Sequence, residues 1–248
     1  PSMLIEMHAH TSRHSPCSLI DPAELVERVR MKGLQGLVIT EHDYLWSPAE
    51  LEDLRKQTGL DGSFLLAAAQ EVSTDIGHVL VYGADHTIEG ISSLKELRAR
   101  YPRAALVWAH PLRKDRTPKI SRLLDADLDA VEIFTNNHTS RGNYFGLMLW
   151  HRYKFTAISG SDTHAVETAG TMPTLFDHPV NDMDGLVEEL KSGRCRPLYK
   201  EIPRTGSNAY VEEISLGTKG EDESRQRIIV KRPRGAQRWD TLRQSAET

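Results

Sequence analysis

Short apolar runs alternate with segments of helical periodicity along most of the chain. Asp21-Pro22 and Ser47-Pro48 each place a capping side chain before a proline at the first position of a helix. We predict further helices over residues 92–101, 118–124, 139–153 and 183–191, and strands over residues 3–8, 36–41, 64–71, 78–82, 104–109, 130–134 and 155–159. This order favours an α/β protein with a parallel sheet of seven strands, and leaves room for a short eighth strand near residues 174–176.

Histidines and carboxylates stand at one end of nearly every predicted strand. Most of them follow an apolar run, whereas His78 opens its run after Gly77. In a parallel barrel the C-terminal ends of the strands open on one face, where βα-barrel enzymes keep their chemistry. Side chains that are far apart in the sequence are therefore predicted to converge there: His8, His10, His42, Glu71, His78, His110, Asp162 and His164.

Composition and charge narrow the class of protein. The 248 residues are 39% hydrophobic and 27% charged, which fits a globular domain that can bury a large core. No apolar stretch approaches the roughly 20 residues of a membrane span, so no membrane association is expected. Cys17 and Cys195 are the only cysteines, which argues against a disulfide framework and predicts a cytoplasmic protein. A net charge of −4 gives no bulk attraction for polyanions.

Six short motifs carry a resemblance to a known family. They are His8-Ala9-His10-Thr11, Thr40-Glu41-His42-Asp43, Glu71-Val72-Ser73, Gly77-His78-Val79-Leu80, Ala109-His110-Pro111 and Gly160-Ser161-Asp162-Thr163-His164. In these motifs, and in their order, the chain resembles the polymerase-and-histidinol-phosphatase (PHP) family of metal-dependent phosphoesterases. The resemblance implies a distorted (βα)7 TIM-like barrel over residues 1–200, with two or three divalent metal ions at the strand ends.

The resemblance also implies a set of metal ligands. A first ion would take His8, His10, Glu71 and Asp162, and a second would take Glu71, His78 and His110, with Glu71 bridging the two. A third would take His42, His164 and one ligand from the loop after His10. His14 is the first candidate for that ligand because imidazole suits these metals, and Cys17 is the alternative, which would favour zinc. Zinc, manganese and iron all suit the set.

These ligands account for phosphoester hydrolysis without a protein nucleophile. Two metals about 3.5–4 Å apart can share a hydroxide, bring its pKa toward neutrality and neutralise the leaving oxygen. We therefore expect hydrolysis of a small phosphomonoester, a nucleotide or a short oligonucleotide, and nucleic acid stays open as a partner. Two alternatives remain: a related metal-dependent hydrolase that cleaves a non-phosphate bond, and a metal-binding module without catalysis.

Residues beside the ligands complete the expected site. Arg113 follows His110-Pro111 closely, and its guanidinium suits bidentate contact with a phosphate. Asp43 directly follows His42 and could either orient that ring or donate a proton to the leaving group. Residues 136–138, Asn-Asn-His, follow a strand and either face the same cavity or cap a loop.

The last part of the chain, residues 201–248, differs in character. It is polar, and between Arg225 and Arg238 it holds six basic residues and no acidic one. One interpretation is a tail that grips nucleic acid. The other is a solvated extension, in which only Ile228, Ile229 and Val230 offer an apolar surface for packing.

Overall fold

The computed structural model describes residues 2–199, 214–215 and 229–230. Its helices are α1 (Pro22–Met31), α2 (Pro48–Thr58), α3 (Leu94–Arg100), α4 (Ile120–Leu123), α5 (Ser140–Tyr153) and α6 (Met183–Ser192), with the short turns η1 (Arg113–Asp115) and η2 (Val166–Thr168). Its strands are β1 (Met3–Glu6), β2 (Gly36–His42), β3 (Leu65–Thr74), β4 (Gly77–Tyr82), β5 (Ala105–Trp108), β6 (Ala130–Phe134), β7 (Ala157–Ser159), β8 (Thr174–Phe176), β9 (Cys195–Tyr199), β10 (Ile214–Ser215) and β11 (Ile229–Val230). The predicted α/β class is confirmed, and so is the short eighth strand.

The helix starts form as their sequences predict. The Asp21 side chain accepts hydrogen bonds from the backbone N–H groups of Ala23 and Glu24 at the start of α1. Ser47 and Glu50 form a reciprocal capping box at the start of α2. Proline occupies the first turn in both helices, where its missing N–H costs no hydrogen bond. These local signals fix where the chain leaves each strand edge and enters a helix.

The strands form a single sheet in the order β11-β10-β9-β8-β1-β2-β3-β4-β5-β6-β7. Pairing is parallel within β1-β2-β3 and within β5-β6-β7. The expectation of a fully parallel sheet is wrong for two of the inner strands, because β4 runs antiparallel to β3 and β5, and β8 runs antiparallel to β1 and β9. The direction of β4 explains His78: a reversed strand begins at the edge where its neighbours end.

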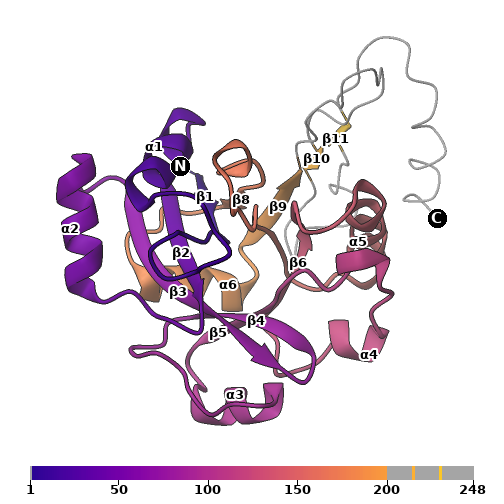
Figure 1. Ribbon diagram of the computed structural model, residues 1–248. Coiled ribbons are helices and arrows are strands. Elements are labelled where there is room, and N and C mark those ends of the chain that lie inside the picture. Colours follow the sequence, from indigo (N-terminus) through magenta and orange to yellow (C-terminus); the bar gives the residue numbers. More distant parts are fainter. Residues whose placement is uncertain (1, 200–213, 216–228, 231–248) are drawn as a thin grey trace.

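The sheet curls until its two sides approach each other (Figure 1). Beyond the ends of β1 and β7, Ala9 and Thr163 form a parallel bridge, and the His10 N–H donates to the Thr163 carbonyl over 3.1 Å. Beside β7, the Ser159 N–H donates to Thr174 Oγ1 of β8 over 3.0 Å. The Leu198 N–H of β9 donates to Ser159 Oγ over 2.9 Å. These contacts produce the nearly closed, barrel-shaped sheet that the family resemblance implies.

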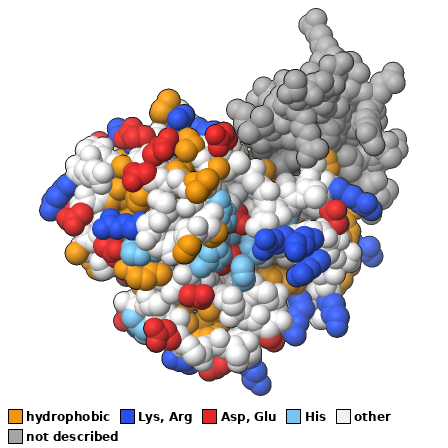
Figure 2. All heavy atoms as spheres, viewed as in Figure 1, with side chains coloured by type: hydrophobic (Ala, Val, Ile, Leu, Met, Phe, Trp, Pro, Cys, Tyr) orange, Lys and Arg blue, Asp and Glu red, His pale blue; other side chains and the backbone are white. Residues whose placement is uncertain are grey.

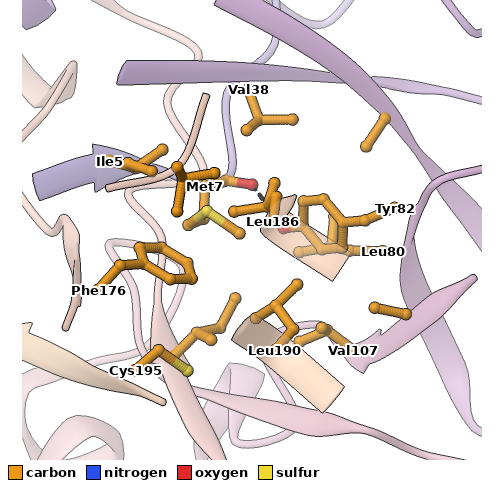
Figure 3. Packing of buried hydrophobic residues seen from close by; sticks show 14 of the residues in the cluster. Ile5, Met7, Val38, Leu80, Tyr82, Val107, Phe176, Leu186, Leu190 and Cys195 are labelled. Atoms are coloured by element: carbon orange, nitrogen blue, oxygen red, sulfur yellow. Dashed lines mark hydrogen bonds between the residues drawn. The ribbon is translucent and has the colours of Figure 1, made fainter. Parts of the chain in front are cut away.

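Alternation along the strands separates an inner from an outer core. Val38 belongs to the inner cluster, whereas its neighbours Leu37 and Ile39 pack outside with α1 and α2. The inner cluster also takes the Tyr82 ring and the apolar face of α6 (Figure 3), and the Tyr82 hydroxyl donates to the Met7 carbonyl over 2.7 Å. Each fully buried aliphatic side chain stabilises this core by roughly 1.5–3 kcal/mol.

The same alternation places the side chains of Glu71 and His42 on the inner face at the ends of β3 and β2. On β3, Leu65, Ala67 and Ala69 belong to the inner cluster, so Glu71 continues that phase at the rim. On β2, Val38 sets the inner phase that reaches His42 four residues later. The apolar pattern that builds the core thus also presents ligands at its open end.

Two features of the chain complete the description. No helix in the described part of the chain is long and apolar enough to cross a membrane. Within residues 201–248, β10 pairs with β9 and β11 pairs with β10, both antiparallel. The remainder of that segment, and with it both interpretations of the basic stretch, lies outside the described residues.

Candidate metal centre

The strand ends bring eight candidate ligands to one place. They arrive from segments scattered between β1 and the loop after β7, in the positions that the motifs predict. Three overlapping groups have ligand atoms that all lie within 4.8 Å of one another: His8, His10, Glu71 and Asp162; His42, Glu71 and His78; His10, His42 and His164. The convergence is a consequence of the fold, because these residues span more than 150 positions of the sequence.

The inner group is buried. His8 Nε2 lies 3.3 Å from both Glu71 Oε2 and Asp162 Oδ1, and His10 Nε2 lies 3.1 Å from both. Both histidine rings have no exposed surface, and the two carboxylates are almost as fully covered. Two imidazole nitrogens and two carboxylate oxygens therefore face a common point.

Glu71 connects this group to the outer histidines. Its Oε1 lies 2.8 Å from His78 Nδ1 and 2.9 Å from His110 Nε2, and its Oε2 lies 3.1 Å from His42 Nδ1. Glu71 therefore lies between the inner group and the outer histidines. The outer group that contains it holds His42 and His78, whereas His110, which the resemblance implies for the second ion, contacts Glu71 but belongs to none of the three groups found within the described residues. The ring of His10 stacks against those of both His42 and His164, with centroids 4.3 and 4.6 Å apart, which joins the third group to the first.

Two buried carboxylate oxygens of the centre lack a hydrogen-bond partner within the described residues, which makes the centre suitable for a cation. Glu71 Oε2 and Asp162 Oδ1 are buried and accept no hydrogen bond among the described residues, although imidazole nitrogens lie 3.1–3.3 Å away. A buried carboxylate oxygen without a partner is costly unless a cation or proton satisfies it. Nitrogen and oxygen donors in this mixture suit zinc, manganese or iron. The residues present therefore fit the divalent ions that the resemblance implies.

The charges of the cluster depend on one another. Burial would lower the pKa of His8, but the carboxylates of Asp162, Glu132 and Glu71 outweigh burial and raise that pKa above its ordinary value. Burial acts in the opposite direction on Glu71, yet the neighbouring histidines, His8 first, bring its pKa well below its usual range. Both glutamate oxygens therefore carry the negative charge that attracts a cation.

The pKa of His42 shifts in the opposite direction to that of His8. Burial lowers the pKa of its imidazole to about 4, because the nearby charge of Glu71 does not offset the loss of solvent. The ring is therefore neutral near pH 7, which is the form that binds a metal.

Two buried glutamates support the inner group, and the sequence analysis missed both. Glu132 Oε1 lies 2.8 Å from His8 Nδ1, and its Oε2 accepts from the His110 N–H over 2.8 Å. Glu6 accepts from the His8 and Ser161 N–H groups and from the Ser161 hydroxyl. A carboxylate that holds the second nitrogen of a metal-binding histidine fixes its tautomer and direction. The available signal was a glutamate inside the otherwise apolar strand Ala130–Phe134.

The chain is tightly packed and strained around these supports. A side chain at Gly160 would bring a Cβ atom within 2.5 Å of both Glu132 Oε1 and His8 Cβ, so only glycine fits there. Asp162, His110 and Asp43 have positive φ angles of 49°, 32° and 49°. Non-glycine residues with such angles are uncommon and are often held in place at functional sites.

The loop after His10 does not bring His14 to the other ligands. His14 Nε2 lies 2.7 Å from Glu50 Oε1, and its ring stacks on Tyr44 at 3.8 Å. His14 and Cys17 are both absent from the three ligand groups found within the described residues. Cys17 is largely exposed. Its partial burial and the charges of Asp162 and Glu71 raise the pKa of its thiol. The third-site ligand stays a prediction for either residue.

Other predicted site residues lie at the rim. Arg113 is exposed in η1 and close enough to His78 for its charge to oppose the raised pKa of that ring. Asp43 is exposed beside His42, and partial burial raises the pKa of its carboxyl. Neither side chain has an ion pair within the described residues, so both are accessible to a ligand.

Residues 136–138 form hydrogen bonds with the loops that carry the candidate ligands. Asn137 Nδ2 donates to Asp162 Oδ2 over 2.5 Å, and Asn136 Nδ2 donates to the Ser161 carbonyl over 3.0 Å. Burial lowers the pKa of His138 to about 4, so its neutral Nε2 accepts from the Leu112 N–H over 3.1 Å. Of the two interpretations, the contacts favour loop capping over substrate contact.

Comparisons with known proteins agree with this picture. Residues 142–195 match the model of a family described as PHP-associated. An uncharacterized protein of Methanocaldococcus jannaschii is 24% identical over 147 residues, which are 55% of this chain and 84% of that protein. The matched family segment includes Asp162 and His164, two of the candidate ligands.

Solved structures share the fold at low sequence identity. A two-domain protein of Bacteroides vulgatus that contains a predicted PHP-like metal-dependent phosphoesterase superposes with a TM-score of 0.61 at 14% identity, covering 87% of this chain and 76% of that one. An amidohydrolase of Chromobacterium violaceum, with bound sulfate and no metal, superposes with a TM-score of 0.53 at 17% identity, covering 77% and 96%.

Proposed function

We propose that the chain is a metal-dependent phosphoesterase of the PHP type. Its barrel, its cluster of candidate ligands and the match of residues 142–195 to the PHP-associated family support this proposal. Its substrate would be a phosphate ester: a small phosphomonoester, a nucleotide or a short oligonucleotide. Two or three divalent ions, chosen among zinc, manganese and iron, would be its cofactors. The proposal extends the family assignment to a reaction and assigns roles to individual side chains.

One observation carries the proposal: buried oxygens of Glu71 and Asp162 face imidazole nitrogens without accepting a hydrogen bond. Such a cluster is expensive to fold unless cations occupy it in the working protein. Divalent ions bound there would supply Lewis acidity, an activated nucleophile and neutralisation of the leaving oxygen. A chain that only needed structural stability would fill the same space with apolar side chains.

The chain's own residues would handle binding and proton transfer. Arg113 stands at the rim beside His78 and would hold a phosphoryl oxygen through paired N–H donors. Asp43 is exposed next to His42, and its raised pKa suits a carboxyl that delivers a proton to the leaving oxygen. Glu132 would keep His8 directed at the centre throughout.

A metal and substrate panel tests the proposal. The full chain, stripped with a chelator and reloaded with manganese, iron or zinc, should hydrolyse p-nitrophenyl phosphate or a nucleotide, and the activity should follow bound metal measured by mass spectrometry. Hydrolysis of amide or lactone substrates alone would instead favour the non-phosphate hydrolase. Tight metal binding without turnover of either class would indicate a metal-binding module.

Arg113→Ala tests the phosphate contact separately. Loss of a charge-assisted contact should raise KM for phosphomonoesters by roughly 10- to 100-fold with metal content unchanged. Lys95→Ala, which removes an exposed cation from α3, is the matched control. A wild-type KM in Arg113→Ala would show that another cation holds the phosphoryl group.

A further inference from the structure

A hollow adjoins the candidate metal centre and is lined mostly by residues outside it. This cavity has a volume of about 370 Å³ and shares His78 and His110 with the centre as part of its lining. Its other walls come from the turn between β3 and β4, from Trp108 at the end of β5, and from the segment between Arg113 and Arg122. A volume of this size falls at the lower end of sites for small molecules.

The lining is strongly cationic. Five basic side chains contribute to it: Arg113, Lys114, Arg116, Lys119 and Arg122. Figure 2 shows Lys and Arg side chains gathered beside histidines on one face of the molecule. No Asp or Glu is among the described residues that line it. Arg122 lies 3.8 Å from carboxylates of Asp75 and Asp125, whereas the other four have no ion pair within the described residues. Like charges so arranged repel one another unless an anion joins them.

The basic segment is held in a defined shape. Lys114 and Asp115 have positive φ angles of 57° and 54°, which non-glycine residues rarely adopt. Asp115 Oδ1 accepts from Thr139 Oγ1 over 2.6 Å, which ties the segment to the start of α5. Asp115 is the one carboxylate of the segment, and it does not line the cavity. The charged side chains of this segment that line the cavity are therefore all basic. A segment whose backbone is already held in place reduces the ordering cost of binding an anion to its unpaired cations.

One phosphoryl group at the metal centre would not use all of these charges, because bound ions and Arg113 would already neutralise it. Lys114, Arg116 and Lys119 follow Arg113 in the sequence and line the cavity, and none of them belongs to the groups of candidate ligands. We propose that this cavity binds a second phosphate group of the same small substrate, so that the chain prefers bisphosphorylated molecules over monophosphorylated ones. The proposal rests on the phosphoesterase function proposed above.

Hydrolysis of matched sugar phosphates tests this preference. The metal-loaded chain should have a kcat/KM for glucose 1,6-bisphosphate at least about 10-fold above that for glucose 6-phosphate, since charge-assisted contacts to phosphate are strong. The double variant Arg116→Ala, Lys119→Ala should lose most of this ratio through a higher KM for the bisphosphate. Lys95→Ala on α3 is the control that should preserve the ratio. Equal kcat/KM values for the two sugars in the wild type would overturn the proposal.

Binding of phosphonates separates this proposal from the phosphoesterase function. Propane-1,3-diphosphonate and propylphosphonate contain no hydrolysable phosphoester. Calorimetry can therefore measure their binding affinities without turnover. Tighter binding of the diphosphonate, lost in the double variant, would support a second phosphate pocket even if no ester is hydrolysed. Turnover of both sugars with equal phosphonate affinities would leave the phosphoesterase standing and reject the pocket. A preference for oligonucleotides over both sugars would also reject it, in favour of a nucleic-acid groove.

Discussion

The two ends of the histidine cluster differ in burial and in support. At the inner end the side chains of His8 and His10 are 0% exposed and that of Asp162 is 2% exposed. At the outer end His42, His78 and His164 keep 33%, 30% and 32% of their side-chain surface exposed. Both ends present imidazole side chains at the same barrel rim. Water reaches one end and is excluded from the other.

The more deeply buried end is also the one whose side chains are held by more hydrogen bonds. The inner His8 has its second ring nitrogen held by Glu132, and Glu6 ties the backbone of His8 to Ser161 in the loop that carries Asp162. At the outer end, His164 Nδ1 lies 2.9 Å from the carbonyl of Asp162, a local contact only two residues away. A ligand whose orientation is fixed in advance loses less entropy when it binds. We therefore expect an ion bound at the inner end to be retained longer than one bound at the outer end.

Glu71→Ala should have the largest effect, because the two oxygens of Glu71 reach histidines at both ends. We expect hydrolysis to fall by at least about 1,000-fold and metal content to collapse, since several kcal/mol of charge stabilisation is lost. The barrel should stay folded because no core packing is removed, and circular dichroism checks this. Glu52→Ala, at an exposed carboxylate 3.4 Å from Lys56 on α2, is the control. Normal turnover and metal content in Glu71→Ala would show that the centre has been misplaced.

His164→Ala should separate the two ends. His164 belongs to the group with His10 and His42 and to neither group that contains Glu71. We expect a loss of about one ion per chain and a smaller fall in turnover than in Glu71→Ala, because one open ligand position weakens only its own ion. His178→Ala is the matched control, since His178 is exposed and pairs with Glu189. Release of every ion from His164→Ala would mean that the ends are not independent.

The convergence of the candidate ligands was predictable for a local reason, and the contacts of their supporting glutamates were not. Glu71 and His42 stand in the inward phase of apolar strands, and His8 and His10 form a recognisable pair, so short motifs were enough. The contact between His8 and Glu132 spans 124 residues and exists only because β6 curls round toward β1. The apolar strand Ala130–Phe134 marks Glu132 as unusual, but the local pattern does not show that its partner is His8.

The same limit applies to strand direction and to the basic cavity. Nothing in the apolar run Val79-Leu80-Val81-Tyr82 distinguishes a parallel from an antiparallel strand, and only the short turn at Gly77, with φ of 106°, indicates a hairpin. The cavity joins this turn to residues 113–122, so its cations become a cluster only after β4 and β5 pair. Charges that look like ordinary loop residues in the sequence then share one space.

Glu132→Gln should weaken the inner end without removing a ligand. The amide keeps the size of the carboxylate but not its charge, so His8 would lose the anion that favours its metal-binding tautomer. We expect metal affinity to fall about 10- to 100-fold, measured by competition with a chelator. Glu188→Gln, at an exposed carboxylate near Arg194, is the control. An unchanged affinity would show that His8 is oriented by packing alone.

His14→Ala should have the smallest effect and decides the remaining ligand. Since His14 Nε2 lies against Glu50 and its ring lies on Tyr44, its removal should cost on the order of 1 kcal/mol of folding stability. The affinity of the outer ion should change by less than about threefold, which is well under 1.4 kcal/mol. Cys17→Ser is the parallel variant, because its exposed thiol stands on the same loop and would affect zinc more than manganese if it were a ligand. Loss of the outer ion from His14→Ala would show that the ring leaves Glu50 to bind metal, and loss from Cys17→Ser would assign the position to the thiol.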